Sequence, residues 1–348
     1  MHTSGPPTRV DVDAGVRTFA NGLLLELVSA LRQTADGDLV GLTSADPRAV
    51  ESDLDAWCRL TGHAIVARTI EQGRARWVIR RGAVDVTAED ERPIGERLWL
   101  YVNFDCNLQC DYCCVRSSPG AARRALGIDA VRRIAAEAPP LGVRAFFVTG
   151  GEPFLLPDID DLVLALAAAA PVTLLTNGML FRGSRLAALR RMPRERVTLQ
   201  VSLDSPTADL HDLHRGRGSW QRAVEGIAIA HGEGFRVRLA ATVATDEDER
   251  AIRDLFDRMR VDPEDRVVRR VALRGFAAAG VAVGRQDLVP EITITANGVY
   301  WHPVGAEDED LLVRREMFPL ADAFLAMQRS VADERAHRDR LASIFYCA

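Results

Sequence analysis

The chain has 348 residues, 47% hydrophobic and 27% charged, a composition typical of a globular protein with a sizeable core. A formal net charge of −5 gives no electrostatic basis for binding nucleic acid or an acidic membrane surface. We expect neither a membrane span nor a signal peptide, because no apolar run is long enough to cross a bilayer and the N-terminus lacks charged and apolar regions. All the basic residues are Arg, which excludes a Schiff-base lysine. Six cysteines, three of them clustered, indicate metal binding in a reducing compartment, so we expect a cytoplasmic protein.

The first predicted unit, residues 8–82, is a small α+β domain with the element order β-α-β-α-β-β. Alternating or apolar runs predict strands at residues 10–13, 39–43, 64–69 and 76–80. Helical spacing predicts one helix around Leu27 and a second around Leu54. Ser52 and Asp55 resemble a capping box that would begin the second helix.

Residues 83–97 are acidic, contain Pro93 and show no clear period, so they are a predicted linker. From residue 98, apolar strands alternate with helical stretches. The expected strands are 98–102, 145–149, 172–176, 197–203, 237–243 and 267–273. The expected helices are 129–138, 158–170, 184–191, 219–231 and 247–259. Six such βα units predict a parallel α/β sheet over residues 98–285, either open or curled into a partial barrel, with the active site at the C-terminal strand ends.

Residues 286–348 break this alternation and form the last predicted segment. Asn297-Gly298 stands between the alternating runs 291–295 and 299–302, which is a strong hairpin signal. A helix over about 318–345 is expected to close the chain.

Three cysteines, Cys106, Cys110 and Cys113, follow the first strand of the βα array directly. Thiolates select zinc or iron–sulfur clusters. A structural zinc site needs a fourth ligand at short spacing, but the next histidines along the chain, His211 and His214, lie far downstream. The adjacent Cys114 is interpreted as a packing residue. Three ligands are an incomplete set for a four-iron cube, and they leave one iron open for another ligand.

The C-x3-C-x2-C spacing at residues 106–113, with an aromatic at Tyr112, resembles the signature of the radical S-adenosylmethionine (SAM) superfamily. Later motifs of that family follow in order at successive strand ends. Gly150-Gly151-Glu152-Pro153 resembles the GGEP motif, and residues 211–219 resemble the D-x-x-R-G-x-G-S stretch. Between them stand Thr176-Asn177-Gly178 and Ser202-Leu203-Asp204. The resemblance covers about residues 98–273.

The resemblance implies one [4Fe–4S] cluster held by Cys106, Cys110 and Cys113, with SAM on the fourth iron. The expected SAM-pocket residues are Tyr112, Gly150, Gly151, Glu152, Pro153, Thr176, Asn177, Ser202, Asp204 and Arg215. The two glycines would let the backbone approach the ligand, Glu152 would accept from the SAM ammonium, and Arg215 would bind the SAM carboxylate.

The implied reaction is one-electron cleavage of SAM to methionine and a 5′-deoxyadenosyl radical, which abstracts hydrogen from a small-molecule or peptide substrate. The implied partner is an external one-electron reductant such as flavodoxin or ferredoxin.

The N-terminal unit resembles the TusA/SirA sulfur-carrier fold, through its element order and through the runs 44–47 and 57–63. That family carries sulfur on a cysteine at the start of its first helix, where this chain has residues 18–23 without a thiol. Cys58 is interpreted as a core residue. The resemblance therefore implies a former carrier domain now used for binding a partner or substrate.

The C-terminal hairpin resembles the start of a SPASM or twitch extension, in which a cysteine after the hairpin binds an auxiliary cluster. His302 stands at that position and only Cys347 follows, so no auxiliary cluster is expected. His302 and Cys347 are candidates for catalytic roles; the alternatives are a structural histidine and a frayed terminal residue.

Two other functions stay open at this point. The chain could be a non-catalytic iron–sulfur redox sensor, although a sensor needs no SAM pocket. It could also be a sulfur-relay or sulfur-insertion protein, which predicts a persulfide on Cys58 or Cys347.

Overall fold

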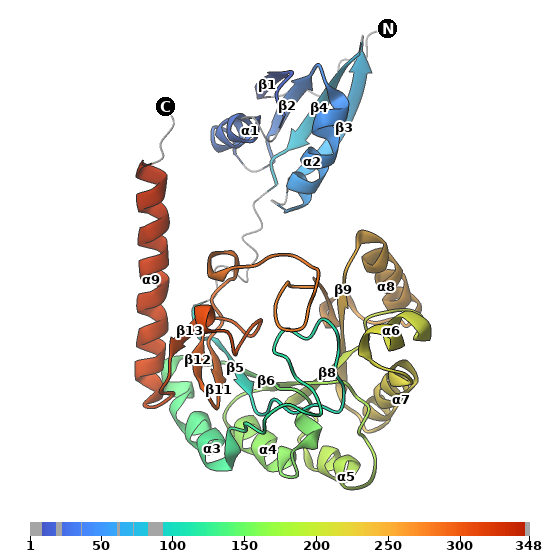
Figure 1. Cartoon of the computed structure of the whole chain (residues 1–348), viewed down its shortest axis with the longest axis vertical. Coiled ribbons are helices and arrows are strands. Elements are labelled where there is room, and N and C mark those ends of the chain that lie inside the picture. The colour runs from blue at the N-terminus through green and yellow to red at the C-terminus, as the bar shows by residue number, and fades with distance from the viewer. Residues whose placement is uncertain are drawn as a thin grey trace. The chain divides into compact units, whose positions relative to one another are not determined.

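A computed structural model describes residues 9–18, 23–35, 37–60, 63–71, 73–82 and 93–344 (Figure 1). The chain divides into two compact units, Met1–Arg92 and Pro93–Ala348. Each unit has its own cluster of buried apolar side chains. No helix among these residues is long and apolar enough to cross a membrane. Cys347 and most of the predicted linker lie outside the described residues.

The first unit is a four-stranded sheet with two helices. Its elements are β1 (Val10–Gly15), α1 (Leu23–Arg32), β2 (Leu39–Ser44), α2 (Pro47–Leu60), β3 (Ala64–Glu71) and β4 (Arg74–Arg80). The strand order is β1-β2-β4-β3, in which only the β1–β2 pair is parallel. The predicted capping box is wrong, because α2 already begins at Pro47 and Ser52 lies inside the helix. Proline favours a first helical turn, since its fixed φ suits the helix and it lacks the N–H that would stay unpaired there.

The second unit contains a nine-stranded sheet of order β10-β9-β8-β7-β6-β5-β11-β12-β13. Its parallel strands are β5 (Arg97–Tyr101), β6 (Ala145–Thr149), β7 (Val172–Thr176), β8 (Val197–Ser202), β9 (Arg236–Val243) and β10 (Arg266–Arg270). The helices between them are α3 (Gly127–Glu137), α4 (Ile159–Ala169), α5 (Gly183–Arg191), α6 (Ala208–Arg215), α7 (Ser219–Gly232) and α8 (Asp246–Arg258). The sequence prediction missed α6, which has only eight residues, and extended β10 by three residues too many.

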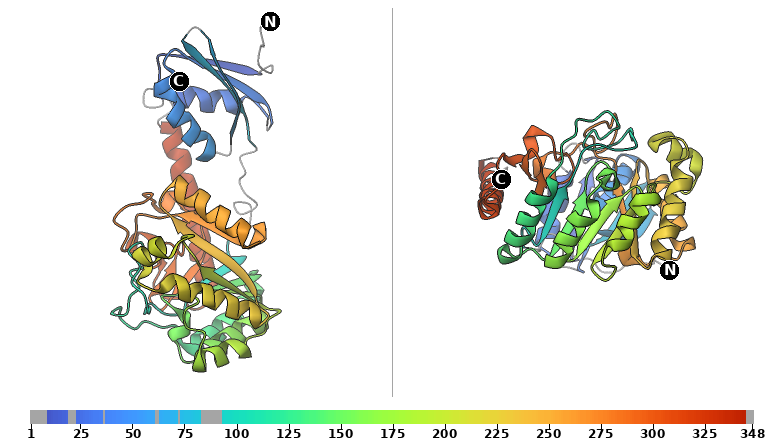
Figure 2. Two further views of the ribbon diagram at one scale, coloured as in Figure 1. Left: turned by 90° about the vertical axis from the view of Figure 1, so that its right-hand side faces the viewer. Right: turned by 90° about the horizontal axis from the view of Figure 1, so that it is seen from below.

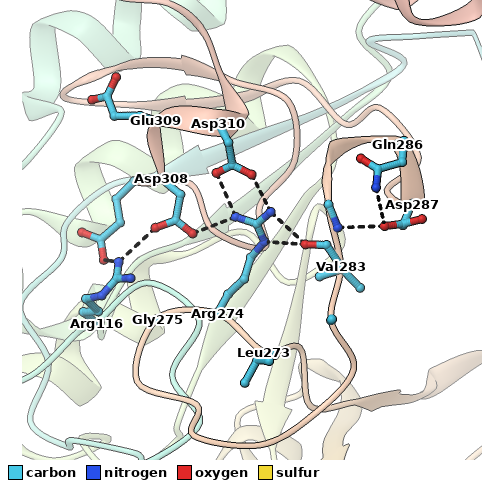
Figure 3. Close-up of a pocket in the computed structure, with 13 residues that line it drawn as sticks. Arg116, Leu273, Arg274, Gly275, Val283, Gln286, Asp287, Asp308, Glu309 and Asp310 are labelled. Atoms are coloured by element: carbon cyan, nitrogen blue, oxygen red, sulfur yellow. Dashed lines mark hydrogen bonds and ion pairs between the residues drawn. The ribbon is translucent and has the colours of Figure 1, made fainter.

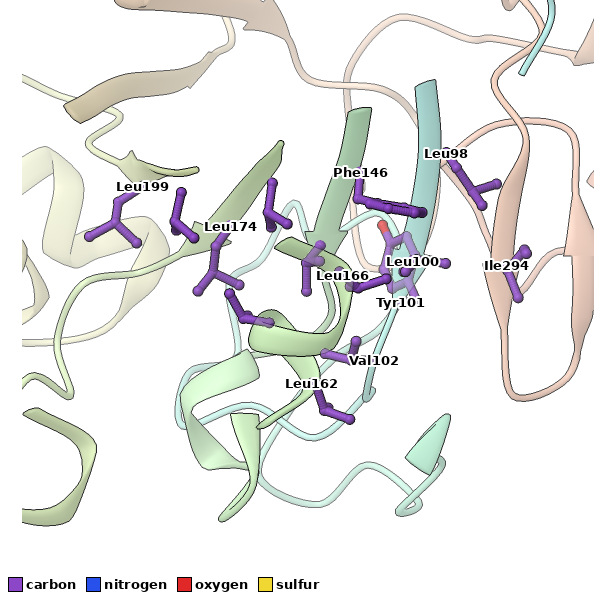
Figure 4. Close-up of a cluster of buried hydrophobic side chains, with 14 of the residues drawn as sticks. Leu98, Leu100, Tyr101, Val102, Phe146, Leu162, Leu166, Leu174, Leu199 and Ile294 are labelled. Atoms are coloured by element: carbon purple, nitrogen blue, oxygen red, sulfur yellow. The ribbon is translucent and has the colours of Figure 1, made fainter. Parts of the chain in front are cut away.

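One face of this sheet packs on the helices and forms the core. Leu100 and Leu174 of the sheet and Leu162 and Leu166 of α4 belong to one apolar cluster, and all four are buried (Figure 4). Burying each leucine contributes roughly 1.5–3 kcal/mol. Figure 1 and Figure 2 show the helices along this outer face, whereas the loop after β5 and the loop after β10 lie on the other side of the sheet. The opposite, inner face therefore carries the polar chemistry.

The C-terminal hairpin extends the same sheet beyond β5. Its strands are β11 (Thr293–Thr295) and β12 (Gly298–Tyr300), and β13 (Leu312–Arg314) pairs with β12. β11 runs parallel to β5, with Thr293 opposite Trp99. The last helix, α9, spans Leu320–Ile344.

Candidate active site

The cysteine loop, residues 102–118, follows β5 and presents its three thiols on irregular backbone. The Leu108 N–H donates to the Cys106 sulfur at 3.4 Å, and the Ser117 N–H donates to the Cys113 sulfur at 3.4 Å. Hydrogen bonds from backbone N–H groups to cysteine sulfur are among the contacts that tune iron–sulfur clusters. The loop is therefore shaped to support sulfur that carries negative charge.

The buried thiols need a cation before they ionise. Burial raises the pKa of Cys106 to about 12 and that of Cys110 to about 11. A coordinated metal removes the thiol proton outright. No group of three or more His, Cys, Asp or Glu among the described residues could hold a single metal ion. The cysteines of a four-iron cube need not converge in this way, because each binds a different iron, so a donor set of three thiols fits that cluster.

Two glycines after β6 let the next motif approach the cysteine loop. A Cβ on Gly150 would stand 2.1 Å from the Asn103 side-chain oxygen, and one on Gly151 would stand 2.2 Å from the Asp105 carbonyl oxygen. The Gly151 N–H donates to the Asn103 carbonyl at 3.1 Å. At both positions the cysteine loop occupies the space that a Cβ would take, and the expected approach of a ligand to this backbone stays a prediction. Glycine is needed here for contact between two parts of the site.

Glu152 is fully buried and ties the ends of β6 and β7 together. Its carboxylate accepts hydrogen bonds from the Phe154 N–H at 3.1 Å, the Thr176 hydroxyl at 2.8 Å and the Asn177 N–H at 2.8 Å. Burial raises the pKa of Glu152, and these hydrogen bonds act against that rise. Pro153 follows in a short buried turn. A role for Glu152 toward the SAM ammonium stays a prediction.

Tyr112, Asp204 and Arg215 form one hydrogen-bonded group beside the cysteines. The Tyr112 hydroxyl and the Arg215 Nε both donate to Asp204 Oδ2, and the same Nε lies 2.8 Å from the Tyr112 oxygen. The Thr242 N–H donates to the other Asp204 oxygen at 2.8 Å. Burial pushes the pKa of Asp204 up, but the Arg215 charge and the hydrogen bonds outweigh it, so this pKa lies below its usual value. The side chains are 7% and 11% exposed, for Asp204 and Arg215 respectively, so the pair is buried.

The α6 segment supplies Arg215 of this pair and also fixes the next helix. Asp212 accepts hydrogen bonds from the Gly218 N–H, the Ser219 hydroxyl and the Trp220 N–H at the start of α7. His211 is buried, and its Nδ1 accepts from the Asp204 N–H at 3.3 Å. Burial and the Arg215 charge lower the pKa of His211 to about 4. These roles were missed: Gly218 suits a helix start, but the contact of Asp212 with α7 depends on how the two helices pack.

The remaining predicted residues lie at the same strand ends. Asn177 follows β7, and its amide donates to the Asn107 side chain at 2.8 Å, which links β7 to the cysteine loop. Ser202 ends β8 and is half-buried. His302 follows β12, where its Nδ1 accepts from the Val304 N–H at 3.0 Å and burial lowers its pKa to about 4.

The loop after β10 closes over the cysteine loop from the other side. The Phe276 N–H donates to the Cys113 carbonyl at 2.9 Å, and Gly275 has a φ of +65° in a place where a Cβ would stand 2.1 Å from that carbonyl oxygen. The next residue back, Arg274, forms ion pairs with Asp308 at 2.9 Å and Asp310 at 2.7 Å (Figure 3). Arg274, Asp308 and Asp310 line a pocket of about 860 Å³.

Comparison with known proteins decides the family of this region. Residues 100–259 match the family described as "Radical SAM superfamily". The chain contains a radical SAM domain. All three cysteines and every predicted SAM-pocket residue lie inside the matched range, whereas Arg274 and His302 lie outside it. Members of this superfamily use a [4Fe–4S] cluster and SAM.

Relatives of the radical SAM domain have several named activities. The antilisterial bacteriocin subtilosin biosynthesis protein AlbA of Bacillus subtilis is 30% identical over 168 residues, which are 47% of this chain and 36% of that protein. The probable GTP 3′,8-cyclase of Archaeoglobus fulgidus is 36% identical over 135 residues, which are 38% of this chain and 44% of that protein. The chain thus spans less than half the length of these two relatives.

A solved structure resembles this chain in fold over about two thirds of its length. The protein anSMEcpe, with bound AdoMet, aligns at a TM-score of 0.53 and 12% identity, over 68% of this chain and 82% of that one. At this identity the likeness concerns the fold.

Proposed function

We propose that the protein is a radical SAM enzyme, with strands β5–β10 as its partial (β/α)6 barrel. The observation that carries this proposal is the docking of the cysteine loop on the Gly150–Glu152 turn, beside the Tyr112–Asp204–Arg215 group. When bound, the cluster would supply the electron that splits SAM into methionine and a 5′-deoxyadenosyl radical, which takes a hydrogen atom from the substrate. Three thiols for the cluster and a polar pocket for its ligand would then lie on one sheet edge.

The residues of this chain would bind and orient SAM. Cys106, Cys110 and Cys113 would hold three irons of the cluster. Arg215 uses only Nε in its described hydrogen bonds, so its terminal N–H groups are suited to the SAM carboxylate. Asp204 would neutralise part of the positive charge of Arg215 and fix its planar guanidinium in one orientation. Glu152 would offer the carboxylate edge for the SAM ammonium.

The substrate would be a peptide or a small molecule. Two of the similar proteins favour a peptide: AlbA is a bacteriocin biosynthesis protein, and a structure of anSMEcpe contains AdoMet and the Kp18Cys peptide. The GTP 3′,8-cyclases are the counterexample. The electron would come from a flavodoxin or ferredoxin, the compartment would be the cytoplasm, and the TusA-like unit would bind a partner or the substrate.

Formation of 5′-deoxyadenosine tests the enzymatic proposal. The protein is reconstituted anaerobically with iron and sulfide and given dithionite and SAM, and the product is measured by mass spectrometry. Product is expected from the wild type and from Cys114→Ala, the matched control at the neighbouring cysteine. Cys110→Ala should lose both the four-iron absorption and the product. A wild type that holds the cluster but forms no product would instead support the redox-sensor alternative.

A further inference from the structure

Arg269 lies on the inner face of the sheet, near the C-terminal end of β10. It pairs in register with Thr242 of β9, and Ala240 of β9 pairs with Ser202 of β8. Side chains alternate along a strand, so these four residues share one face. The other face of β8 and β9 carries Leu199 and Leu239, which belong to the apolar core under the helices. Arg269 therefore points to the side on which the candidate active site lies.

Two contacts bring Arg269 close to the site. The Thr242 N–H, directly beside Arg269 in register, holds Asp204 at 2.8 Å. A few residues after Arg269, the chain reaches the cysteine loop through the hydrogen bond from Phe276 to Cys113. Only strand β9 thus separates Arg269 from β8, the strand that Asp204 follows. A short loop connects Arg269 to the residue that contacts Cys113.

The charge of Arg269 acts across the inner face. It lowers the pKa of His302, after burial as the larger cause, and it also acts on Tyr101 of β5. β5 and β10 are separated by four strands in the sheet, so this interaction does not pass between neighbouring strands. The guanidinium therefore acts on groups that lie across the inner face, at β5 and after β12.

Arg269 differs from the other arginines whose charge reaches His302. Arg97 is paired with Glu291, and Arg274 is paired with Asp308 and Asp310. Arg269 is exposed and makes no hydrogen bond or ion pair with any residue of the described part of the chain. A planar guanidinium without a partner in the described part of the chain is suited to bidentate binding of an oxyanion.

We propose that Arg269 binds an anionic group of the substrate, a carboxylate or a phosphate, and orients the substrate before the cysteine loop. This assignment rests on the proposed function, because it treats the inner face as the place of the reaction. It gives the open part of the site a chemical preference: substrates with a negative group within reach of β10. The cofactor-binding side, where Asp204 already neutralises Arg215, is not the source of this preference.

Chemical footprinting of the intact, cluster-reconstituted protein tests the proposal without a known substrate. Phenylglyoxal labels accessible arginines, and peptide mapping reports each one separately. We expect Arg269 to be labelled, and inorganic phosphate or acetate to slow its labelling about tenfold at ten times the dissociation constant of the anion. Arg132, an exposed arginine on α3 with no described partner, is the internal control and should not respond. Protection by one anion alone identifies the phosphate or the carboxylate as the preferred group.

Variants provide the second measurement. Calorimetric titration gives the dissociation constant of the protecting anion: Arg269→Gln should raise it about tenfold, Arg269→Lys should raise it less because the charge is kept, and Arg132→Gln should leave it unchanged. An Arg269 that neither anion protects overturns the proposal. So does an Arg269 that SAM alone protects, because the residue would then belong to the SAM site. Neither readout needs turnover, so failure here is distinct from a failure to form 5′-deoxyadenosine.

Discussion

The two ends of the large sheet handle buried charge in opposite ways. At the β5–β9 end, Glu152 and Asp204 are buried, the Arg215 side chain is 11% exposed, and the three are bonded to one another or to strand ends. At the β10–β13 end, the Arg274 side chain is 9% exposed but one of its partners, Asp310, is 55% exposed, and Arg269 is exposed without a described partner. The first arrangement is rigid before any ligand arrives, which suits a cofactor that is always the same. The second arrangement leaves the Arg269 charge exposed, where a ligand or water can bind to it.

The largest expected effect comes from removing one charge of the buried pair. Asp204→Asn leaves the Arg215 cation buried without its counter-ion, so we expect a loss of roughly 3 kcal/mol in the free energy of unfolding of the second unit. Asp310→Asn, the matched change at the other end of the sheet, should cost no more than about 1 kcal/mol, because Asp310 is mostly exposed. Urea denaturation, read by hydrogen exchange of β8 peptides, measures both.

A double variant separates the charge from the packing. Asp204→Asn combined with Arg215→Gln should be more stable than Asp204→Asn alone, since the unpaired cation is then gone. If Asp204→Asn and Asp310→Asn lower the free energy of unfolding equally, the two ends of the sheet do not differ in this way.

The rigid end is also the part that the sequence predicts well. The cysteine loop and the Gly150, Asn177 and Asp204 motifs each follow a strand, and the C-terminal ends of parallel strands meet at one edge. The local order of the chain therefore carries most of that site. The pairing of Asp204 with Arg215 and the contact of Gly150 with the cysteine loop were not predicted, because they depend on how the loops pack.

The open end could not be predicted from local patterns. Arg269 is one of many arginines, and nothing in its neighbours distinguishes it from Arg270, which faces the other way and pairs with Asp246. Its direction depends on the end of β10 and on the curvature of the whole sheet. His302 was selected only because it stands where a relative would have a cysteine. A residue whose environment comes from strands far apart in the sequence has no short-range signature.

A smaller effect is expected from pH, and it involves one histidine at each end of the sheet. Both His211 and His302 have a pKa lowered by burial from 6.5 to about 4. The unfolded chain binds these protons below pH 6.5, whereas the folded protein binds them only near pH 4, so acid favours unfolding in that window. Between pH 7.5 and 5.5, each histidine should lower the free energy of unfolding by about 1 kcal/mol.

Urea denaturation at several pH values measures this loss, and two single variants assign it. His302→Asn can keep an acceptor for the Val304 N–H and should remove only its own share of the pH dependence. His211→Asn should do the same at the Asp204 end. A slope that stays unchanged in both variants would show that other groups dominate the acid sensitivity.

The smallest expected effect concerns the first unit. The apolar clusters of the two units share no residue: one runs from Val12 to Ile79, and the other begins at Leu98. Every residue that we assign to the iron–sulfur cluster or to SAM lies after Tyr101 in the sequence. Deleting residues 1–92 should therefore leave the rate of 5′-deoxyadenosine formation without substrate within about twofold, a change of roughly 0.4 kcal/mol in the activation free energy.

The same deletion tells whether the first unit contributes to the cofactor site. Iron content and the product rate are measured side by side in the full chain and in residues 93–348, under identical reconstitution. If the shorter chain binds four irons but cleaves SAM much more slowly, the first unit positions SAM. If it loses the iron as well, the second unit depends on the first to fold, despite its separate core. With both quantities kept, any loss of turnover on a later-identified substrate assigns the first unit to binding that substrate or a partner.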